Sequence, residues 1–335
     1  MKNKPFQYAL AGLAILFLLS VSSCSCNRRA PGQNDPANYV YYLGASPAAG
    51  LGDAKAAAAK LLGPNLTGSF ISNTGDGNVY YTDKNDPTVR FQQDPATGSF
   101  SFSRSLAGYL GDMKPSLPSM TEASSVARDY LKNTGLLPAD EKQLHVTHVG
   151  GVKSSSVING SKRGEDIDKM RTVVFTRAID SVGVVGPGSK IVVQLGDKNA
   201  LVGMAYRWKN LSKDKPRKFV PLTEQITQAD AQNEVKQRVI GEFGENVQYT
   251  VISSRKMLYD GDENTLQPVY AFEVAVRAAI GKSQVGMYQY LYLIQAMKQS
   301  PEPIQIATVP PEAKRLIDTV NLRANRPRPD STAKE

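Results

Sequence analysis

Three stretches of the chain place hydrophobic residues at the spacing of an amphipathic helix. Each begins after a polar residue that can cap a helix, namely Asp53, Thr121 or Thr227, and each ends at a glycine. Hydrophobic positions three and four residues apart share one face of a helix, so we predict three helices that each pack on a core. The positions on these faces are Ala54, Ala57, Ala58, Leu61 and Leu62; Ala123, Val126, Ala127, Tyr130 and Leu131; and Ala231, Val235, Val239, Ile240 and Phe243.

Period-two alternation and turn residues predict β-strands after each helix. The polar segment 153–169 interrupts this alternation and is predicted to be a loop. The pattern therefore predicts an α+β fold of tandem small modules, each a helix packed on an antiparallel β-sheet. The predicted strands are 79–81, 89–92 and 99–102 after the first helix; 144–149, 170–177, 189–195 and 201–208 after the second; and 247–253, 267–276 and 287–294 after the third.

Changes of composition divide the chain into segments. We predict an N-terminal α+β module at 39–114, a second module at 119–209, a third at 219–298, and a short helix with a disordered tail at 299–335. The second and third modules begin alike, because Met120-Thr121-Glu122-Ala123 aligns with Ile226-Thr227-Gln228-Ala229. This alignment indicates an internal duplication.

The first residues follow the pattern of a bacterial lipoprotein signal peptide. Lys2 and Lys4 precede an apolar run at 9–19, and the sequence Val-Ser-Ser before Cys24 resembles the lipobox, in which cleavage exposes a cysteine that receives lipid. We predict a signal peptide at 1–23, a lipid on Cys24 and a tether at 24–38. The lipid would hold the protein to a membrane of the cell envelope, on its periplasmic or extracellular face. An ordinary signal peptide with incidental cysteines is the alternative.

Composition and charge limit the partners. The net charge of +9 is spread along a chain that is 41% hydrophobic, as in ordinary globular proteins. The most basic linker, 210–218, has no interleaved aromatic residues, so we predict no nucleic-acid partner. Cys24 and Cys26 are the only cysteines, so we expect no disulfide within the body of the protein.

The only two histidines, His145 and His148, lie three residues apart in a predicted strand. Residues three apart in a regular strand face opposite sides of the sheet, so the pair would need a bulge to share one metal ion. We therefore predict no metal site here.

Three further segments resemble a calcium-binding loop, a phosphate-binding loop and a nucleophile elbow, but each lacks a feature that the motif requires. A calcium-loop rhythm begins at Asp260, but Thr265 stands at the place of the required glycine and Ala271 at that of the glutamate. Segment 186–190 resembles a phosphate loop but opens a strand, and segment 281–285 lacks the last glycine of a nucleophile elbow. All three are predicted to be turns. We predict no catalytic residue and no cofactor, and hence a protein that is not an enzyme.

The stretch 171–208 resembles known modules. Its order of strand, glycine-rich turn and hairpin, at 175–180, 184–193 and 195–199, is similar to that of fungalysin/thermolysin propeptide (FTP) and PepSY modules. The resemblance extends over about 119–294 and implies small antiparallel sheets packed on one helix. It also implies a role beside a secreted protease, as an inhibitory or folding segment, or a role as an independent envelope regulator. No His-Glu-x-x-His protease motif follows in this chain.

These features predict a non-catalytic, lipid-anchored envelope or extracellular protein that binds a partner protein, such as a protease or an envelope sensor, through a sheet edge or face. The alternative is a lipoprotein that holds a small molecule or glycan between two modules. The candidate ligand or partner face comprises the aromatic residues Tyr206, Trp208 and Tyr270. An enzyme with a site assembled from scattered carboxylates is a third alternative.

The lipid anchor predicts the mass of the mature N-terminus. Mass spectrometry of the protein from its native membrane should show Cys24 as the first residue, with lipid on its thiol. A free amine on any other first residue would contradict the anchor.

Overall fold

The computed structural model describes residues 32–154, 157–158, 162–163, 166–280 and 283–304. This part of the chain contains three α-helices and sixteen strands, so the predicted α+β class is confirmed. The helices are α1 (Ala54–Leu62), α2 (Met120–Asn133) and α3 (Gln228–Phe243). No helix among the described residues has both the length and the apolar character needed to cross a membrane. The predicted signal peptide, Cys24 and the predicted C-terminal helix lie outside these residues.

Fourteen strands form one sheet, and two short strands form a separate ribbon. The large sheet is antiparallel except for one short ladder between β10 and β14, which run parallel. The path of the sheet is β13-β1-β15-β14-β10-β9-β11-β12-β5-β4-β3-β2, with β16 paired to β15 and β6 paired to β9 beside it. The strands are β1 (Tyr39–Tyr42), β2 (Ser69–Ser72), β3 (Val79–Thr82), β4 (Arg90–Gln93), β5 (Phe100–Ser103), β6 (Leu144–Ser154), β7 (Val157–Ile158), β8 (Lys162–Arg163), β9 (Ile167–Ile179), β10 (Val182–Val185), β11 (Lys190–Leu195), β12 (Leu201–Arg207), β13 (Arg217–Phe219), β14 (Gln248–Asp260), β15 (Thr265–Ile280) and β16 (Ser283–Gln295).

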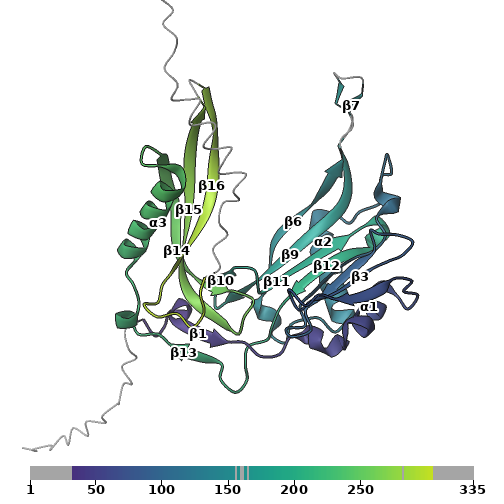
Figure 1. Cartoon of the computed structure of the whole chain (residues 1–335), viewed down its shortest axis with the longest axis horizontal. Helices are drawn as coiled ribbons and strands as arrows, with labels where there is room; N and C mark the ends of the chain where they lie inside the picture. The colour runs from purple at the N-terminus through teal and green to yellow at the C-terminus, as the bar shows by residue number, and fades with distance from the viewer. Residues whose placement is uncertain (1–31, 155–156, 159–161, 164–165, 281–282, 305–335) are drawn as a thin grey trace, which may run out of the picture.

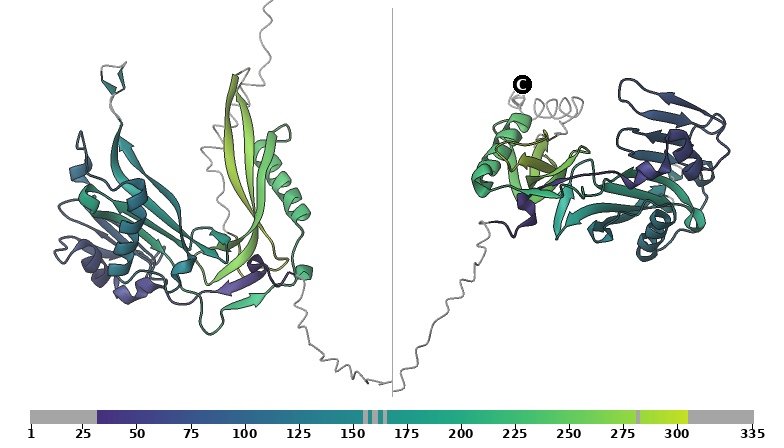
Figure 2. Two further views of the ribbon diagram at one scale, coloured as in Figure 1. Left: turned by 180° about the vertical axis from the view of Figure 1, so that it is seen from behind. Right: turned by 90° about the horizontal axis from the view of Figure 1, so that it is seen from below.

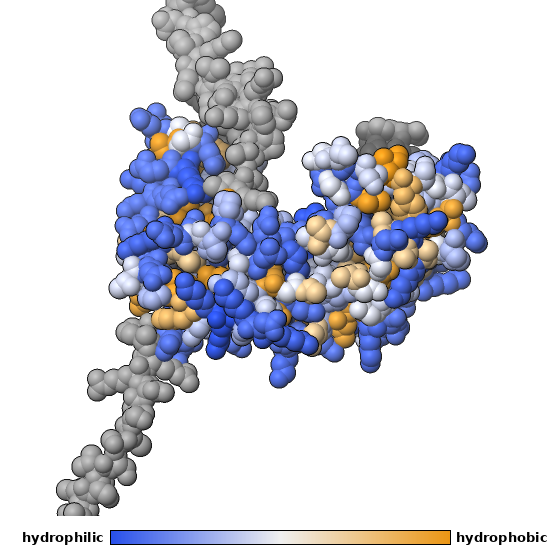
Figure 3. Space-filling view, turned by 60° about the horizontal axis from the view of Figure 1, so that its bottom comes forward, coloured by the Kyte–Doolittle hydropathy of each residue, from blue (hydrophilic) through white to orange (hydrophobic). Residues whose placement is uncertain are grey.

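The elements gather into two lobes (Figures 1 and 2). The first lobe contains α1, α2, strands β2 to β6, β9, β11 and β12, and the second contains α3, β1 and β13 to β16. In the first lobe α2 packs on β6, β9 and β11, and in the second α3 packs on β15 and β16. Strand β10 joins the lobes, because it pairs with β9 on one side and with β14 on the other. The surface is indented between the two lobes (Figure 3).

The predicted boundary near residue 115 does not separate two cores. Strand β5 pairs with β12, which places Phe102 opposite Met204 and extends one sheet across the boundary. The Phe100 and Tyr206 rings stack with centroids 5.4 Å apart, and both belong to one hydrophobic cluster with residues of α1 and α2. The short β2–β5 hairpins bury their apolar face by joining the larger sheet, so segment 39–114 is not an independent unit.

The N-terminal strand also departs from the predicted division. β1 pairs with β13 and β15, so it belongs to the second lobe and not to the 39–114 module. The ordered body begins before the predicted end of the tether, because Asp35 caps a 3₁₀ turn over Pro36–Asn38. Asn38 is buried and accepts a hydrogen bond from the Lys256 ammonium of β14. This contact fixes the chain to the second lobe ahead of residue 39.

The helix starts agree with the sequence in two cases and differ in one. Asp53 accepts a hydrogen bond from the Ala56 amide at 2.8 Å, as predicted for the cap of α1. Thr227 caps α3 in a capping box with Asp230, as also predicted. The cap of α2 is Ser119 rather than Thr121, because Ser119 and Glu122 exchange both hydrogen bonds of a capping box.

This cap corrects the alignment of the two helix starts. With Ser119 placed on Thr227, the buried positions of the two helices coincide one by one, whereas the alignment from sequence is shifted by two residues. The capping box therefore marks the common starting point better than the local identity of Thr and Ala. The paired buried positions are Ala123 with Ala231, Ala127 with Val235, and Leu131 with Val239.

The predicted loop at 153–169 continues the sheet at both ends and carries a separate short ribbon between them. β6 extends to Ser154, β9 begins at Ile167, and β7 and β8 form the short ribbon between them. A polar residue can occupy a buried strand position here because its side chain finds hydrogen-bond acceptors within the fold. The buried Lys169 ammonium donates to the carbonyls of Gly111 and Met113 at 2.6 Å each, which also fixes the preceding loop.

The α2 cap can be tested by substitution. Ser119→Ala removes the acceptor for the Glu122 amide and should lower the free energy of unfolding by about 1 kcal/mol, measured by urea denaturation. Thr121→Ala is the comparison variant, because Thr121 is the cap predicted from sequence; in the structure its exposed hydroxyl contacts only the Ser119 hydroxyl, at 3.0 Å, so its loss should cost less. A larger loss from Thr121→Ala than from Ser119→Ala would contradict this assignment.

Candidate functional site

The structure places Tyr206 and Trp208 inside the first lobe and not on a binding face. Tyr206 is fully buried, stacks on Phe100, and donates a hydrogen bond to the Leu136 carbonyl at 2.9 Å. Burial raises the pKa of its phenol above the ordinary value. Trp208 is 2% exposed and packs against the Arg177 guanidinium, 4.2 Å from the ring centroid. Tyr206 in β12 and Trp208 just after it point to the core side of the sheet. Their rings are therefore unavailable to a ligand or partner.

Tyr270 lies in the other lobe, apart from these two residues. Its half-buried ring packs against the α3 cluster, and its hydroxyl donates to the Ile226 carbonyl at 3.3 Å. Burial raises the pKa of this phenol as well. The three aromatic residues predicted from sequence therefore do not meet in one site.

The two histidines lie on the same face of β6, contrary to the prediction. A register shift between Val146 and His148 sets His145 opposite Thr176 and His148 opposite Val174, and these two partners share one face of β9. The His148 ring covers Gly150, where no space remains for a Cβ atom. Among the described residues no group of three or more histidine, cysteine or acidic side chains gathers around a possible metal position.

The acidic segment that begins at Asp260 is the turn between β14 and β15, as predicted. Asp260 is 2% exposed and accepts hydrogen bonds from the Ser189 hydroxyl and from the Asp262 amide. The carbonyls of Asp262 and Glu263 accept from the Lys209 ammonium at 3.0 and 2.6 Å. Burial beside Asp260 raises the pKa of the Asp262 carboxyl. The turn therefore docks on the end of β12, and its carbonyls are used within the fold.

The β16 strand forms an edge of the second lobe. It contains 13 residues, and among the described residues its ladder is with β15 alone. Its sequence has no charged residue and no proline, and Tyr288 and Leu291 are 50% and 56% exposed. The carbonyl of Leu293 accepts a hydrogen bond from Arg238 of α3, which limits the open part of the edge to the residues before it.

Other edges of the sheet carry features that discourage pairing with another chain. β2 has four residues and β13 has three, of which two are basic. β6 has two register shifts and carries Lys153, and the part of β14 beyond its β10 ladder carries Arg255 and Lys256. Short length, bulges and lysine are known protections of sheet edges; β16 has one register shift near its start, but neither shortness nor charge.

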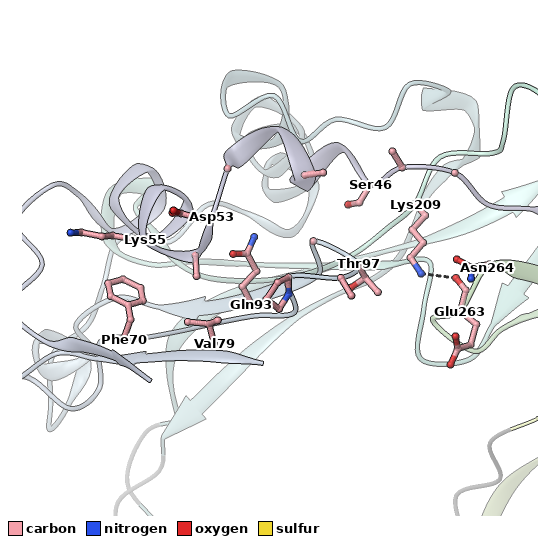
Figure 4. A pocket seen from close by; sticks show the side chains of 18 residues that line it. Ser46, Asp53, Lys55, Phe70, Val79, Gln93, Thr97, Lys209, Glu263 and Asn264 are labelled. Atoms are coloured by element: carbon pink, nitrogen blue, oxygen red, sulfur yellow. Dashed lines mark hydrogen bonds between the residues drawn. The ribbon is translucent and has the colours of Figure 1, made fainter. Parts of the chain in front are cut away.

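A cavity of about 870 Å³ opens on the first lobe between the 44–55 segment and the face of β2 to β4 (Figure 4). Phe70 and Lys55 lie toward one end, and Lys209, Glu263 and Asn264 lie toward the other. Because the last two residues belong to the β14–β15 turn, both lobes contribute to the wall. We call this cavity the Gln93 pocket, after the residue at its centre.

Gln93 is the unusual residue of this pocket. It is 3% exposed, because β4 buries Phe91 and Gln93 on the same side. Its carboxamide extends from the sheet toward the 44–55 segment (Figure 4), and its atoms are not among the buried polar atoms that the described residues leave without a partner. The amide therefore opens to the cavity, where water or a bound molecule can supply its hydrogen bonds.

The remaining polar groups of the pocket are mostly used within the fold. The Thr97 hydroxyl donates to Asp94 at 2.7 Å, the Ser46 hydroxyl accepts from the Ala48 amide at 3.1 Å, and Lys209 is bound to the turn. Figure 4 shows the Lys55 side chain extending away from Gln93. The pocket thus presents a free amide over a partly apolar wall.

Comparisons with known proteins give only distant likenesses. No family model matches the chain, and no curated protein matches it. An uncharacterized protein from Eubacterium rectale ATCC 33656 is 10% identical, with a TM-score of 0.41 over 80% of this chain and 86% of that chain. The C-terminal domain of Bacillus megaterium YpeB is 15% identical, with a TM-score of 0.27 over 71% of this chain and 94% of that chain. Likenesses at this level assign neither a family nor a function.

The burial of Trp208 predicts a structural role. Trp208→Ala should lower the free energy of unfolding by about 3–5 kcal/mol, because it leaves a cavity and removes the ring that covers Arg177. Chemical denaturation of the variant measures this loss. A variant as stable as the parent would show that the ring is not part of the core.

Proposed function

We propose that this chain is a non-catalytic, lipid-anchored protein of the cell envelope that binds a partner protein by accepting one of its strands along β16. The proposal rests chiefly on one observation, the long edge without charge or proline. An edge of this kind is a template for pairing with another chain, and proteins usually block it unless it is used. The predicted lipid on Cys24 supplies the anchor in this proposal.

Strand addition would use the backbone for affinity and side chains for specificity. Unpaired amide and carbonyl groups of an edge form a ladder with an extended segment of any sequence. Tyr288 and Leu291 lie before Leu293 on opposite faces of β16, so each offers an apolar contact on one face of the added strand. The partner is therefore a protein with an exposed, extended and uncharged segment, such as a loop of a protease or of an envelope sensor.

The arrangement of helices supports a relation to PepSY and FTP modules within this proposal. α2 and α3 begin with the same type of capping box, bury three equivalent positions, and each pack on long antiparallel strands. We propose that they mark two related modules joined through β10. In such a protein the second module would present the binding edge, and the protein would modulate a protease or regulate an envelope process.

The edge can be tested in cells that carry the protein. A photo-crosslinking residue in place of Tyr288 should give a specific adduct with one protein, measured by quantitative mass spectrometry. Leu291→Lys in the same chain should reduce the adduct by about tenfold or more, because a charge at the docked strand must be desolvated.

Ile71→Lys is the matched control. Ile71 is 65% exposed on the short edge strand β2, so the substitution adds the same charge to another edge. It should leave the adduct unchanged. Equal loss from both substitutions, or no loss from Leu291→Lys, would contradict binding at β16.

A further inference from the structure

We propose that the Gln93 pocket binds a neutral oligosaccharide. This site lies in the first lobe and at the β14–β15 turn, away from the edge of β16, and it does not depend on partner binding. Its volume of about 870 Å³ is within the range of small-ligand sites. The chemistry of its wall decides the class of ligand.

The hydrogen-bonding groups select a polar ligand. The buried Gln93 carboxamide offers two donors and one acceptor in a plane, and none of them is used by the described residues. The Asn264 carboxamide at the other end of the pocket is exposed and can reach a ligand there. A purely apolar molecule such as a lipid chain would leave the buried amide unpaired, at a cost in free energy. A carbohydrate satisfies both, because each hydroxyl both donates and accepts.

The charges of the pocket select a neutral ligand. Two acidic residues, Asp53 and Glu263, and two basic residues, Lys55 and Lys209, line the wall, so their formal charges cancel. The Lys209 ammonium already binds two carbonyls, and the Asp53 carboxylate already caps α1. Lys55 extends away from Gln93 and Glu263 lies at the far end of the pocket (Figure 4), so the charges nearest to Gln93 are already used within the fold.

The apolar part of the wall fits sugar rings. Phe70 is half-buried, its ring is tilted by 34° against that of Tyr81 with centroids 4.9 Å apart, and it lies at one end of the cavity (Figure 4). An aromatic ring can cover the face of a sugar that carries C–H groups, while the hydroxyls at the rim of the sugar bind amides. The volume of about 870 Å³, with Phe70 and Asn264 among the residues of its wall, favours several linked rings over one.

The position of the pocket argues against an extended peptide. Peptides that bind sheets pair their backbone with a strand edge. Here Phe70, Val79 and Gln93 line the pocket with side chains from the face of three adjacent strands, and the paired backbone is behind them. A peptide would find no ladder in this place.

Calorimetric titration of the purified protein tests the proposal. The probes are maltotriose, tri-N-acetylchitotriose and, as the peptide arm, trialanine. At least one oligosaccharide should bind, and Gln93→Ala should weaken its association constant by about tenfold or more, because the only buried amide of the site is lost. Phe70→Leu changes the half-buried wall and should weaken the association constant several-fold. This variant tests the site if Gln93→Ala does not fold.

Gln92→Ala is the matched control, because Gln92 is the neighbouring residue and its amide faces the opposite side of β4, toward Tyr80. It should leave binding unchanged. Binding of neither sugar, binding of trialanine alone, or equal weakening by the control would overturn the proposal. Leu291→Lys should not alter sugar binding, so failure here and failure of the β16 proposal are distinguishable.

Discussion

One buried cation, the guanidinium of Arg177, lies near the place where β9 leads into β10, the strand that joins the two lobes. It is 1% exposed, lies against the Trp208 ring and donates to the Lys209 carbonyl, while its Nε and Nη1 have no partner among the described residues. Burial lowers its pKa to about 10, so the group still carries its charge at neutral pH. A buried charge must be compensated, and here the aromatic ring, the carbonyl and the field of Asp260 do so.

These contacts lie beside the β10 ladders, and they are one of several links between the lobes. Arg177 belongs to β9 of the first lobe, whereas Asp260 ends β14 of the second. The Lys209 ammonium reaches across to the carbonyls of the β14–β15 turn, and a small apolar cluster with Ile179, Val184 and Leu258 fills the space beside it. Because the turn is held in this way, Glu263 and Asn264 close one end of the Gln93 pocket. The same turn leads into β15, on which the β16 edge is built.

The residues of the proposed binding regions could be found from the sequence only in part. Sequence periodicity correctly put Tyr206 and Trp208 on one face of a strand, but it could not tell a core face from a surface face. Gln93 was missed, although a signal was present: it stands two residues after Phe91, at an inward position where an apolar residue is the rule. The absence of charge in β16 can be seen in the sequence, but its meaning depends on the finding that, among the described residues, this strand pairs on one side only.

The sequence by itself determined the local structure: the α+β class, the caps of α1 and α3, and the turn after Asp260. These features depend on groups a few residues apart, so hydrogen-bonding side chains and glycines specify them directly. Only the tertiary structure decided that β1 joins the second lobe, that β5 pairs with β12, and that a bulge turns both histidines to one face. Pairing between distant strands follows from the burial of whole faces, which no short stretch encodes. For the same reason, the free amide in its pocket and the open edge of β16 became visible only in the folded chain.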